Sequence, residues 1–128
     1  MRRVCWIILL WSVVLAGEWV HWLGDYRQAL KVSQKTGRPL LVLMVSKDCG
    51  GCRKVLTTAF RDTQVAAWVN RHTVPVIVTK EFGNYPVEML YTLDYPTLFL
   101  MDSEERFLKK PLKGAVEGRS LREWLMPR

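Results

Sequence analysis

Residues 46–54 of the chain read Ser-Lys-Asp-Cys-Gly-Gly-Cys-Arg-Lys, so that two thiols, Cys49 and Cys52, are separated by two glycines. The preceding residues 40–45, Leu-Leu-Val-Leu-Met-Val, form an apolar run with the length of a buried strand. The residues that follow show apolar side chains at helical spacing, namely Val55, Leu56, Ala59 and Phe60. The sequence therefore predicts that the two thiols lie at a strand-to-helix junction, with Cys49 at or near the first turn of the helix.

A strand-to-helix junction favours reactive thiol chemistry. Unpaired backbone N–H groups at the start of a helix stabilise negative charge, so a thiol placed there ionises more easily. Gly50 and Gly51 let the chain bend tightly and let a substrate backbone come close. Cysteines three residues apart on a helical turn lie on one face and can close into a disulfide. A C-x-x-C motif after a strand indicates a redox-active pair, and the alternatives are half of a zinc site or a static disulfide.

The zinc alternative depends on the few other ligands that the sequence offers. Three cysteines are too few for a site made of cysteines alone or for a disulfide scaffold. The two histidines, His21 and His72, would both have to converge on Cys49 and Cys52. The redox interpretation needs no such convergence, and we predict no metal and no cofactor.

Composition indicates one globular domain. The chain of 128 residues is long enough for a single core, and 49% hydrophobic with 24% charged residues excludes a disordered chain. The net charge of +7 could indicate nucleic acid or a membrane surface, but the basic residues are spread along the sequence with no run of five or more. A solvated basic surface is the ordinary explanation, and we predict no nucleic-acid partner.

The N-terminal segment resembles a secretory signal peptide. Two arginines follow Met1, and residues 4–17 are almost wholly apolar, about fourteen residues where a bilayer span needs about twenty. Val14-Leu15-Ala16 supplies residues suitable for cleavage, so we predict a signal peptide over residues 1–16 and a domain over residues 17–128. Cys5 falls inside the apolar segment and receives no role. The alternative is an uncleaved anchor in the inner membrane, whereas cleavage gives a periplasmic protein in an oxidising compartment.

Helical periodicity predicts four helices besides the one at the cysteines. Their ranges are residues 26–36, 64–71 and 86–92, and a last amphipathic helix that Ser120 caps. Asp25 is the predicted N-cap of the first helix, and Gly37 followed by proline is the predicted end of it.

The strand predictions rest on apolar runs bounded by turn residues. Residues 19–23 indicate a short first strand or an extended lead-in, and residues 74–78 a strand whose Pro75 suggests an edge position. A further strand opens with Tyr95-Pro96 and continues to Met101. After a polar turn, Phe107-Leu108 begins the partner strand of a hairpin.

Taken together, these features resemble the thioredoxin superfamily over about residues 22–126. The features are Cys49-Gly-Gly-Cys52 after a buried strand, Tyr95-Pro96-Thr97 opening a later strand, a hairpin with Gly114, and a C-terminal amphipathic helix. The resemblance implies an α/β thioredoxin-like fold with a central mixed β-sheet flanked by helices. It also implies that Pro96 follows a cis peptide bond and lies against the active-site disulfide, where Tyr95 and Pro96 form a substrate platform.

The lead-in resembles exported bacterial thioredoxin-like proteins more than cytosolic thioredoxin, on account of Trp22, Asp25-Tyr26 and Gly37-Arg38-Pro39. Two positions depart from the family pattern. Asp48 stands where most thioredoxins have a tryptophan, and Leu43 stands where many have a buried aspartate.

The resemblance implies a thiol–disulfide oxidoreductase in which Cys49 attacks and Cys52 resolves the mixed disulfide. We expect a reductase, since the Gly-Gly spacer lacks the histidine of strongly oxidising members. The expected partners are protein or peptide disulfides and an upstream membrane electron donor, and the expected state is a monomer. The alternative function is a thioredoxin-fold binding module, whose thiols hold a soft metal such as copper(I) or form only a structural disulfide.

Overall fold

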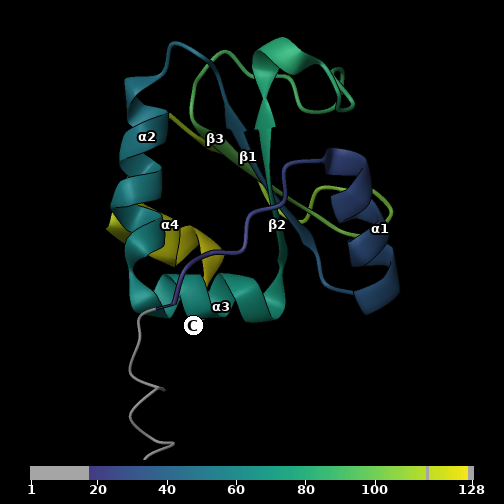
Figure 1. Cartoon of the computed structure of the whole chain (residues 1–128), viewed down its shortest axis with the longest axis horizontal. Helices are drawn as coiled ribbons and strands as arrows, with labels where there is room; N and C mark the ends of the chain where they lie inside the picture. Colours follow the sequence, from purple (N-terminus) through teal and green to yellow (C-terminus); the bar gives the residue numbers. More distant parts are fainter. Residues whose placement is uncertain (1–17, 115, 127–128) are drawn as a thin grey trace, which may run out of the picture.

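A computed structural model of the chain describes residues 18–114 and 116–126 (Figure 1). The predicted signal peptide over residues 1–16, including Cys5, lies outside the described residues. Within the described part of the chain, no helix is long and apolar enough to cross a membrane.

A four-stranded mixed sheet forms the centre of the structure, in the order β2-β1-β3-β4. The apolar run predicted as a buried strand is β1 (Leu40–Val45), which pairs in parallel with β2 (Val74–Thr79) and antiparallel with β3 (Thr97–Met101). The short strand β4 (Leu112–Lys113) pairs antiparallel with β3. Strand β2 is an edge strand, as its proline predicts.

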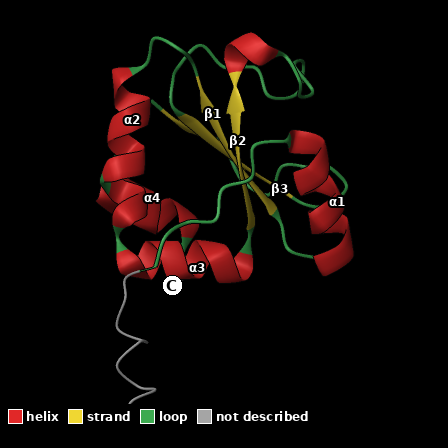
Figure 2. Cartoon of the chain, viewed as in Figure 1, coloured by secondary structure: helices red, strands yellow, loops and turns green. Residues whose placement is uncertain are grey.

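Helices cover both faces of the sheet (Figure 2). The described residues form the α-helices α1 (Tyr26–Thr36), α2 (Gly50–Thr57), α3 (Thr63–His72) and α4 (Gly118–Leu125), and the 3-10 turns η3 (Ala59–Arg61) and η4 (Lys80–Phe82). Their ends follow local chemistry. Asp25 accepts the N–H of Arg27 at 2.9 Å and caps α1, and Gly37 ends that helix with φ 77°, which glycine adopts without strain.

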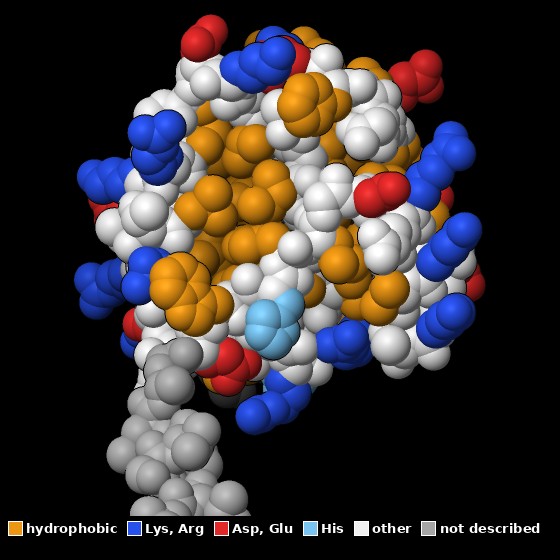
Figure 3. Space-filling model, viewed as in Figure 1, with side chains coloured by type: hydrophobic (Ala, Val, Ile, Leu, Met, Phe, Trp, Pro, Cys, Tyr) orange, Lys and Arg blue, Asp and Glu red, His pale blue; other side chains and the backbone are white. Residues whose placement is uncertain are grey.

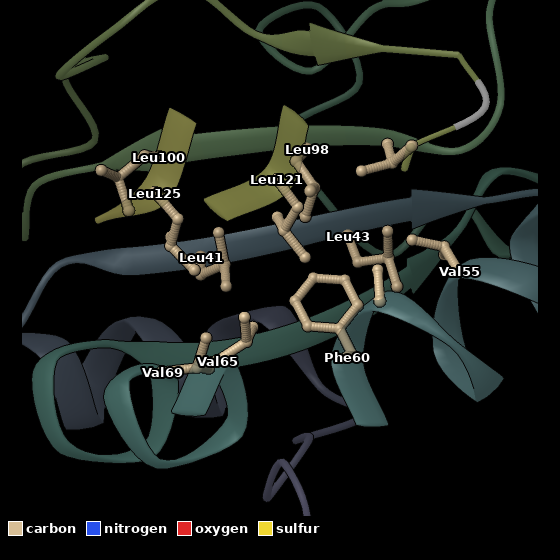
Figure 4. Packing of buried hydrophobic residues seen from close by; sticks show 12 residues of the cluster. Leu41, Leu43, Val55, Phe60, Val65, Val69, Leu98, Leu100, Leu121 and Leu125 are labelled. Carbon is tan, nitrogen blue, oxygen red and sulfur yellow. The ribbon is translucent and has the colours of Figure 1, made fainter. Parts of the chain in front are cut away.

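Alternate side chains of β1 point to opposite faces of the sheet, so β1 contributes to two cores. Leu41 and Leu43 pack with residues of α2, η3, α3 and α4, as Figure 4 shows for Phe60 and Leu121. Leu40, Val42 and Met44 pack on the other face with α1, β2 and β3. Apolar side chains of the first core are visible between α2 and the sheet in Figure 3, with Lys and Arg side chains around them.

The prediction of a helix over residues 86–92 is wrong. The N–H groups of Met89 and Leu90 both donate to the carbonyl of Pro86 at 3.1 Å, and the turn does not continue. Leu90 is buried, but the apolar residues at helical spacing from it, Val87 and Leu93, are 50% and 79% exposed, so this segment buries no continuous helical face. An irregular segment, residues 83–94, therefore joins η4 to the loop before β3.

Residues 19–23 are an extended lead-in, the second of the two predicted alternatives, and make one bridge, Leu23 with Val76. Two other boundaries differ from the predictions. Phe107 makes one isolated bridge to Met101, and the ladder resumes only at β4, because residues 108–111 stand opposite only two residues of β3 and Pro111 has no N–H to donate.

Helix α4 begins at Gly118, two residues before Ser120, which was predicted to cap it. Glu117 occupies the N-cap position without a side-chain cap bond, and its carbonyl accepts the N–H of Leu121 at 2.9 Å. The buried face of the helix is nevertheless the predicted one, with Leu121 and Leu125 inward.

Candidate functional site

Cys49 and Cys52 form a disulfide at the start of α2, with Cα atoms 5.3 Å apart. Cys49 is the N-cap residue, in an extended conformation, and its Sγ accepts the N–H of Cys52 at 3.1 Å. Cys52 is 5% exposed, whereas Cys49 is partly exposed. The sulfur at the helix end is thus the accessible one, as the assignment of Cys49 as attacking thiol requires.

The loop before β3 packs against this turn. The Tyr95–Pro96 peptide bond is cis, as the resemblance implies. A Cβ atom added to Gly51 would lie 3.4 Å from Pro96 Cδ and 4.0 Å from the Tyr95 carbonyl oxygen. The proline and the Tyr95 carbonyl therefore lie close to the disulfide-bearing turn, where a side chain larger than a methyl group at Gly51 would meet them.

Polar side chains hold the proline loop from behind. The hydroxyls of Thr92 and Thr97 lie 3.1 Å apart, and the Thr97 hydroxyl donates to the Asp94 carbonyl at 2.6 Å. The Thr92 hydroxyl accepts the N–H of Asp94 at 3.1 Å. The Tyr95 hydroxyl donates to the Thr92 carbonyl at 2.9 Å. Burial, and then the carboxylate of Glu81, raises the pKa of Tyr95, so this phenol remains a donor.

Charged and aromatic side chains of η4 contact the segment before α2 and the proline loop. Glu81 in η4 accepts the backbone N–H of Lys47 at 3.1 Å, so this carboxylate reaches the segment between β1 and α2. The Lys47 ammonium lies 5.7 Å from the ring centre of Phe82, and the Lys80 ammonium 5.6 Å from that of Tyr95. These are cation–π distances. Lys80 thus adds positive potential next to the proline loop.

The strand beneath the cysteines is apolar. Leu43 is fully buried, and its register partners in the neighbouring strands are Ile77 and Leu98. The position where many thioredoxins have an aspartate is thus filled by a hydrocarbon side chain inside the first core.

The histidines take part in other contacts. The backbone of His21 donates to Asn70 at 2.8 Å, and the ring of His72 lies 4.9 Å from that of Trp68 in α3. Over residues 18–114 and 116–126, no group of three or more His, Cys, Asp or Glu side chains is placed to hold a metal ion.

Sequence reasoning identified both cysteines, Tyr95 and Pro96, and the structure brings these four residues together. The sequence did not point to Thr92, because the role of this residue depends on the path of an irregular segment. Its only sequence signal is a second threonine five residues later, beside the proline.

No protein-family model matches the chain. No curated protein matches it. Solved structures do match. A candidate disulphide isomerase from Bacteroides thetaiotaomicron has a TM-score of 0.72 and 25% identity, covering 84% of this chain and 91% of that one. A thioredoxin from Thermus thermophilus has a TM-score of 0.68 and 19% identity, and the match covers 87% of this chain and 85% of the thioredoxin. The oxidoreductase DsbH has a TM-score of 0.64 and 20% identity, covering 87% and 88%.

These similarities show that the chain has the thioredoxin fold. The fold and the C-x-x-C disulfide at a helix start support thiol–disulfide oxidoreductase activity.

Proposed function

We propose that the protein is an exported reductase of protein disulfides in the cell envelope. The observation that carries the thiol–disulfide exchange is the asymmetry of the two sulfurs, whereas the reductant direction is proposed from the Gly-Gly spacer, which lacks the histidine of strongly oxidising members. Cys49 is accessible and accepts a backbone N–H at the end of α2, while Cys52 is buried behind it. A thiolate on Cys49 would keep that hydrogen bond and gain from the helix end, so it is suited to attack.

The reaction begins with both thiols reduced. The Cys49 thiolate attacks one sulfur of a substrate disulfide, forms a mixed disulfide and releases the first substrate sulfur as a thiolate. Cys52 loses its proton and attacks Cys49 Sγ, which forms the Cys49–Cys52 disulfide and releases the second substrate thiolate. Two electrons pass from the protein to the substrate, and both substrate thiolates take protons from water.

The substrate polypeptide lies along the proline loop in this proposal. The Tyr95 carbonyl is 4.0 Å from a Cβ position at Gly51, so it faces the turn that carries the cysteines. A backbone carbonyl at this place can accept an N–H of an extended substrate, as the edge of a sheet does. Pro96 keeps the substrate close to Cys49.

Regeneration requires a reductant, because the Cys49–Cys52 disulfide is the product of each turnover. We propose a membrane-bound dithiol protein as the electron donor and a monomeric reductase as the acceptor. The proposal of a donor is supported by the disulfide at the start of α2, which must be reduced again after each reaction.

Insulin reduction tests the activity, with the parent protein, Cys49→Ser and Cys52→Ser compared at equal concentration. We expect the parent to accelerate reduction by a dithiol, Cys49→Ser to lose that acceleration, and Cys52→Ser to accumulate a mixed disulfide. A parent no faster than Cys49→Ser would exclude the reductase. A parallel copper(I) titration would then test the metal-binding alternative.

A redox titration of Cys49 and Cys52 decides the direction. A potential below that of the compartment supports the reductase, and one well above it would indicate an oxidase. Mass spectrometry of protein recovered from the cell envelope tests export. We expect an N-terminus near Gly17, whereas recovery of Met1 would indicate an uncleaved anchor.

A further inference from the structure

The irregular segment before the proline loop leaves apolar side chains exposed. Tyr91 is 67% exposed and Leu93 79% exposed, and Leu108 in the hairpin is 51% exposed. Large apolar side chains gathered on one surface of a soluble domain commonly mark a binding site.

Two hollows carry these side chains. The first, of about 340 Å³, is lined by Leu93 and Tyr91 together with Tyr95, the residue before the cis-proline. The second, of about 410 Å³, is lined by Tyr91, Phe107 and Leu108. Tyr91 lines both hollows, so the two adjoin and form one surface. The first hollow borders the proline loop at Tyr95, and the second borders β4, whose Lys113 pairs with the residue after Pro96. We call this surface the docking track.

The charged side chains that line the docking track are all lysines. Lys80 lines the first hollow, and Lys110 and Lys113 line the second, whereas no carboxylate lines either one. Lys109 also lines the second hollow, but its ammonium donates to the carbonyl of Trp124. Lys110 and Lys113 are exposed and make no salt bridge within the described residues.

The track is continuous with the place where the substrate would lie. Lys113 pairs in register with Thr97, the residue after Pro96, so the basic end of the track is anchored beside the proline loop. In Figure 1 the segment after η4 lies at the end of the molecule where α2 begins. A chain that reaches Cys49 along the Tyr95 carbonyl can therefore continue over both hollows.

We propose that the docking track binds an extended acidic and apolar segment of the polypeptide whose disulfide Cys49 reduces. The inference rests on the proposed function. Carboxylates of the segment pair with Lys110 and Lys113, and its apolar side chains fill the hollows beside Tyr91 and Leu108. An anionic lipid surface has the same charge, but concave hollows that begin at the proline loop fit a polypeptide better than a flat membrane.

The test uses the reduced exported protein, with its N-terminus near Gly17 and therefore without Cys5, and synthetic peptides with one cysteine held in a disulfide with thionitrobenzoate, whose release is followed by absorbance. One peptide has a tail of about ten residues, roughly 33 Å when extended, that alternates Glu or Asp with Leu or Phe. A second has Lys in place of the acidic residues, and a third has no tail. Each tail is placed on either side of the cysteine, and the faster arrangement is used.

We expect the acidic tail to raise the second-order rate constant of the single reaction between reduced protein and peptide about ten-fold over the peptide without a tail, and the basic tail to give no gain. In K110E/K113E the ratio between acidic-tailed and tail-free peptides should fall to about two. The matched control is K31E/K35E, which reverses two exposed lysines of α1 and should keep the full ratio. Salt at about 0.5 M should reduce the gain, because exposed charges are screened.

Equal turnover of the acidic-tailed and tail-free peptides by the parent would overturn the docking track and leave the reductase standing. Failure to turn over any peptide faster than Cys49→Ser would overturn the reductase itself. The surface would instead be assigned to a membrane by three results together: the parent sediments with phosphatidylglycerol vesicles, K110E/K113E does not, and the tails have no effect on the reaction.

Discussion

Gly51 faces Pro96 across the two segments that form the site, and a Cβ on Gly51 would lie 3.4 Å from Pro96 Cδ. A Cβ on Gly50, by contrast, would meet no other atom within 4 Å. The two glycines between the cysteines therefore have different surroundings, and this difference can be tested.

Gly51→Leu should lower kcat/KM for insulin reduction about ten-fold, because a branched side chain must displace Pro96 and the substrate path beside it. Gly50→Leu is the matched control, and we expect a loss below about two-fold. Thermal unfolding of both variants checks that the fold is intact. Equal losses in the two variants would mean that the contact with Pro96 does not position the substrate.

In the reduced protein, Cys49 should react with iodoacetamide before Cys52. Cys49 is the accessible sulfur at the helix end, and Cys52 is 5% exposed. Mass spectrometry after brief alkylation measures the order. Faster modification of Cys52 would reverse the roles that we assign to the two thiols.

Resolution of the mixed disulfide should be slow at neutral pH and accelerate as pH rises. Cys52 must lose its proton before it attacks, and Leu43 offers no base beneath it. Leu43→Asp should speed resolution near pH 7 and cost about 3 kcal/mol or more of stability, because it buries a carboxyl group.

Leu43→Asn is the control for this change, since it is polar but cannot act as a base. Single-turnover kinetics across pH compare the three proteins, at a temperature where urea titrations show all of them folded. A flat profile in the parent, matched by both variants, would show that another group takes the proton.

Asp62 joins two helices in a way that depends on pH. Its carboxylate caps α3 by accepting the N–H of Gln64 at 2.9 Å and of Val65 at 3.1 Å, and it pairs with Arg122 of α4. These bonds, the one from Val65 first, hold the pKa of Asp62 below its ordinary value of 3.8. The ionised Asp62 therefore stabilises the folded protein fully above pH 3.8, the pKa of the unfolded chain. This stabilisation is lost as the pH falls through the lower pKa that Asp62 has in the folded protein.

Asp62→Ala should lower the free energy of unfolding by about 1 kcal/mol at pH 7. Asp62→Asn keeps a capping oxygen and should lose less, because the exposed pair with Arg122 adds at most about 1 kcal/mol. Urea titrations at pH 7 and pH 2.5 measure both. The difference between the parent and Asp62→Asn should shrink at the lower pH, and a constant difference would contradict the linkage.

Local patterns predicted the parts of the fold that local physics decides. The apolar run of β1, the cap at Asp25, the end at Gly37 and the C-x-x-C turn depend on neighbours in sequence, and all are found where the sequence placed them. The cis-proline followed from the family resemblance.

The parts that were not predicted depend on contacts between distant residues. The Tyr26 hydroxyl donates to Glu105 at 2.7 Å, 79 positions away, and no periodicity indicates such a bond. The segment around Leu90 satisfied the start signal for a helix, but its exposure is decided by the hairpin and the proline loop that it packs beside. The docking track follows from the same segment and could not be foreseen.

The threonine hydroxyls behind the proline loop have a consequence for both redox states. The bonds between Thr92, Thr97 and the Asp94 backbone involve neither cysteine, so opening the disulfide breaks none of them. The entropy of ordering this loop is lost when the chain folds, before any substrate arrives. A partner thus meets a preorganised surface in the oxidised and the reduced protein alike. A partner can then distinguish the oxidised from the reduced protein only by the sulfur atoms of Cys49 and Cys52.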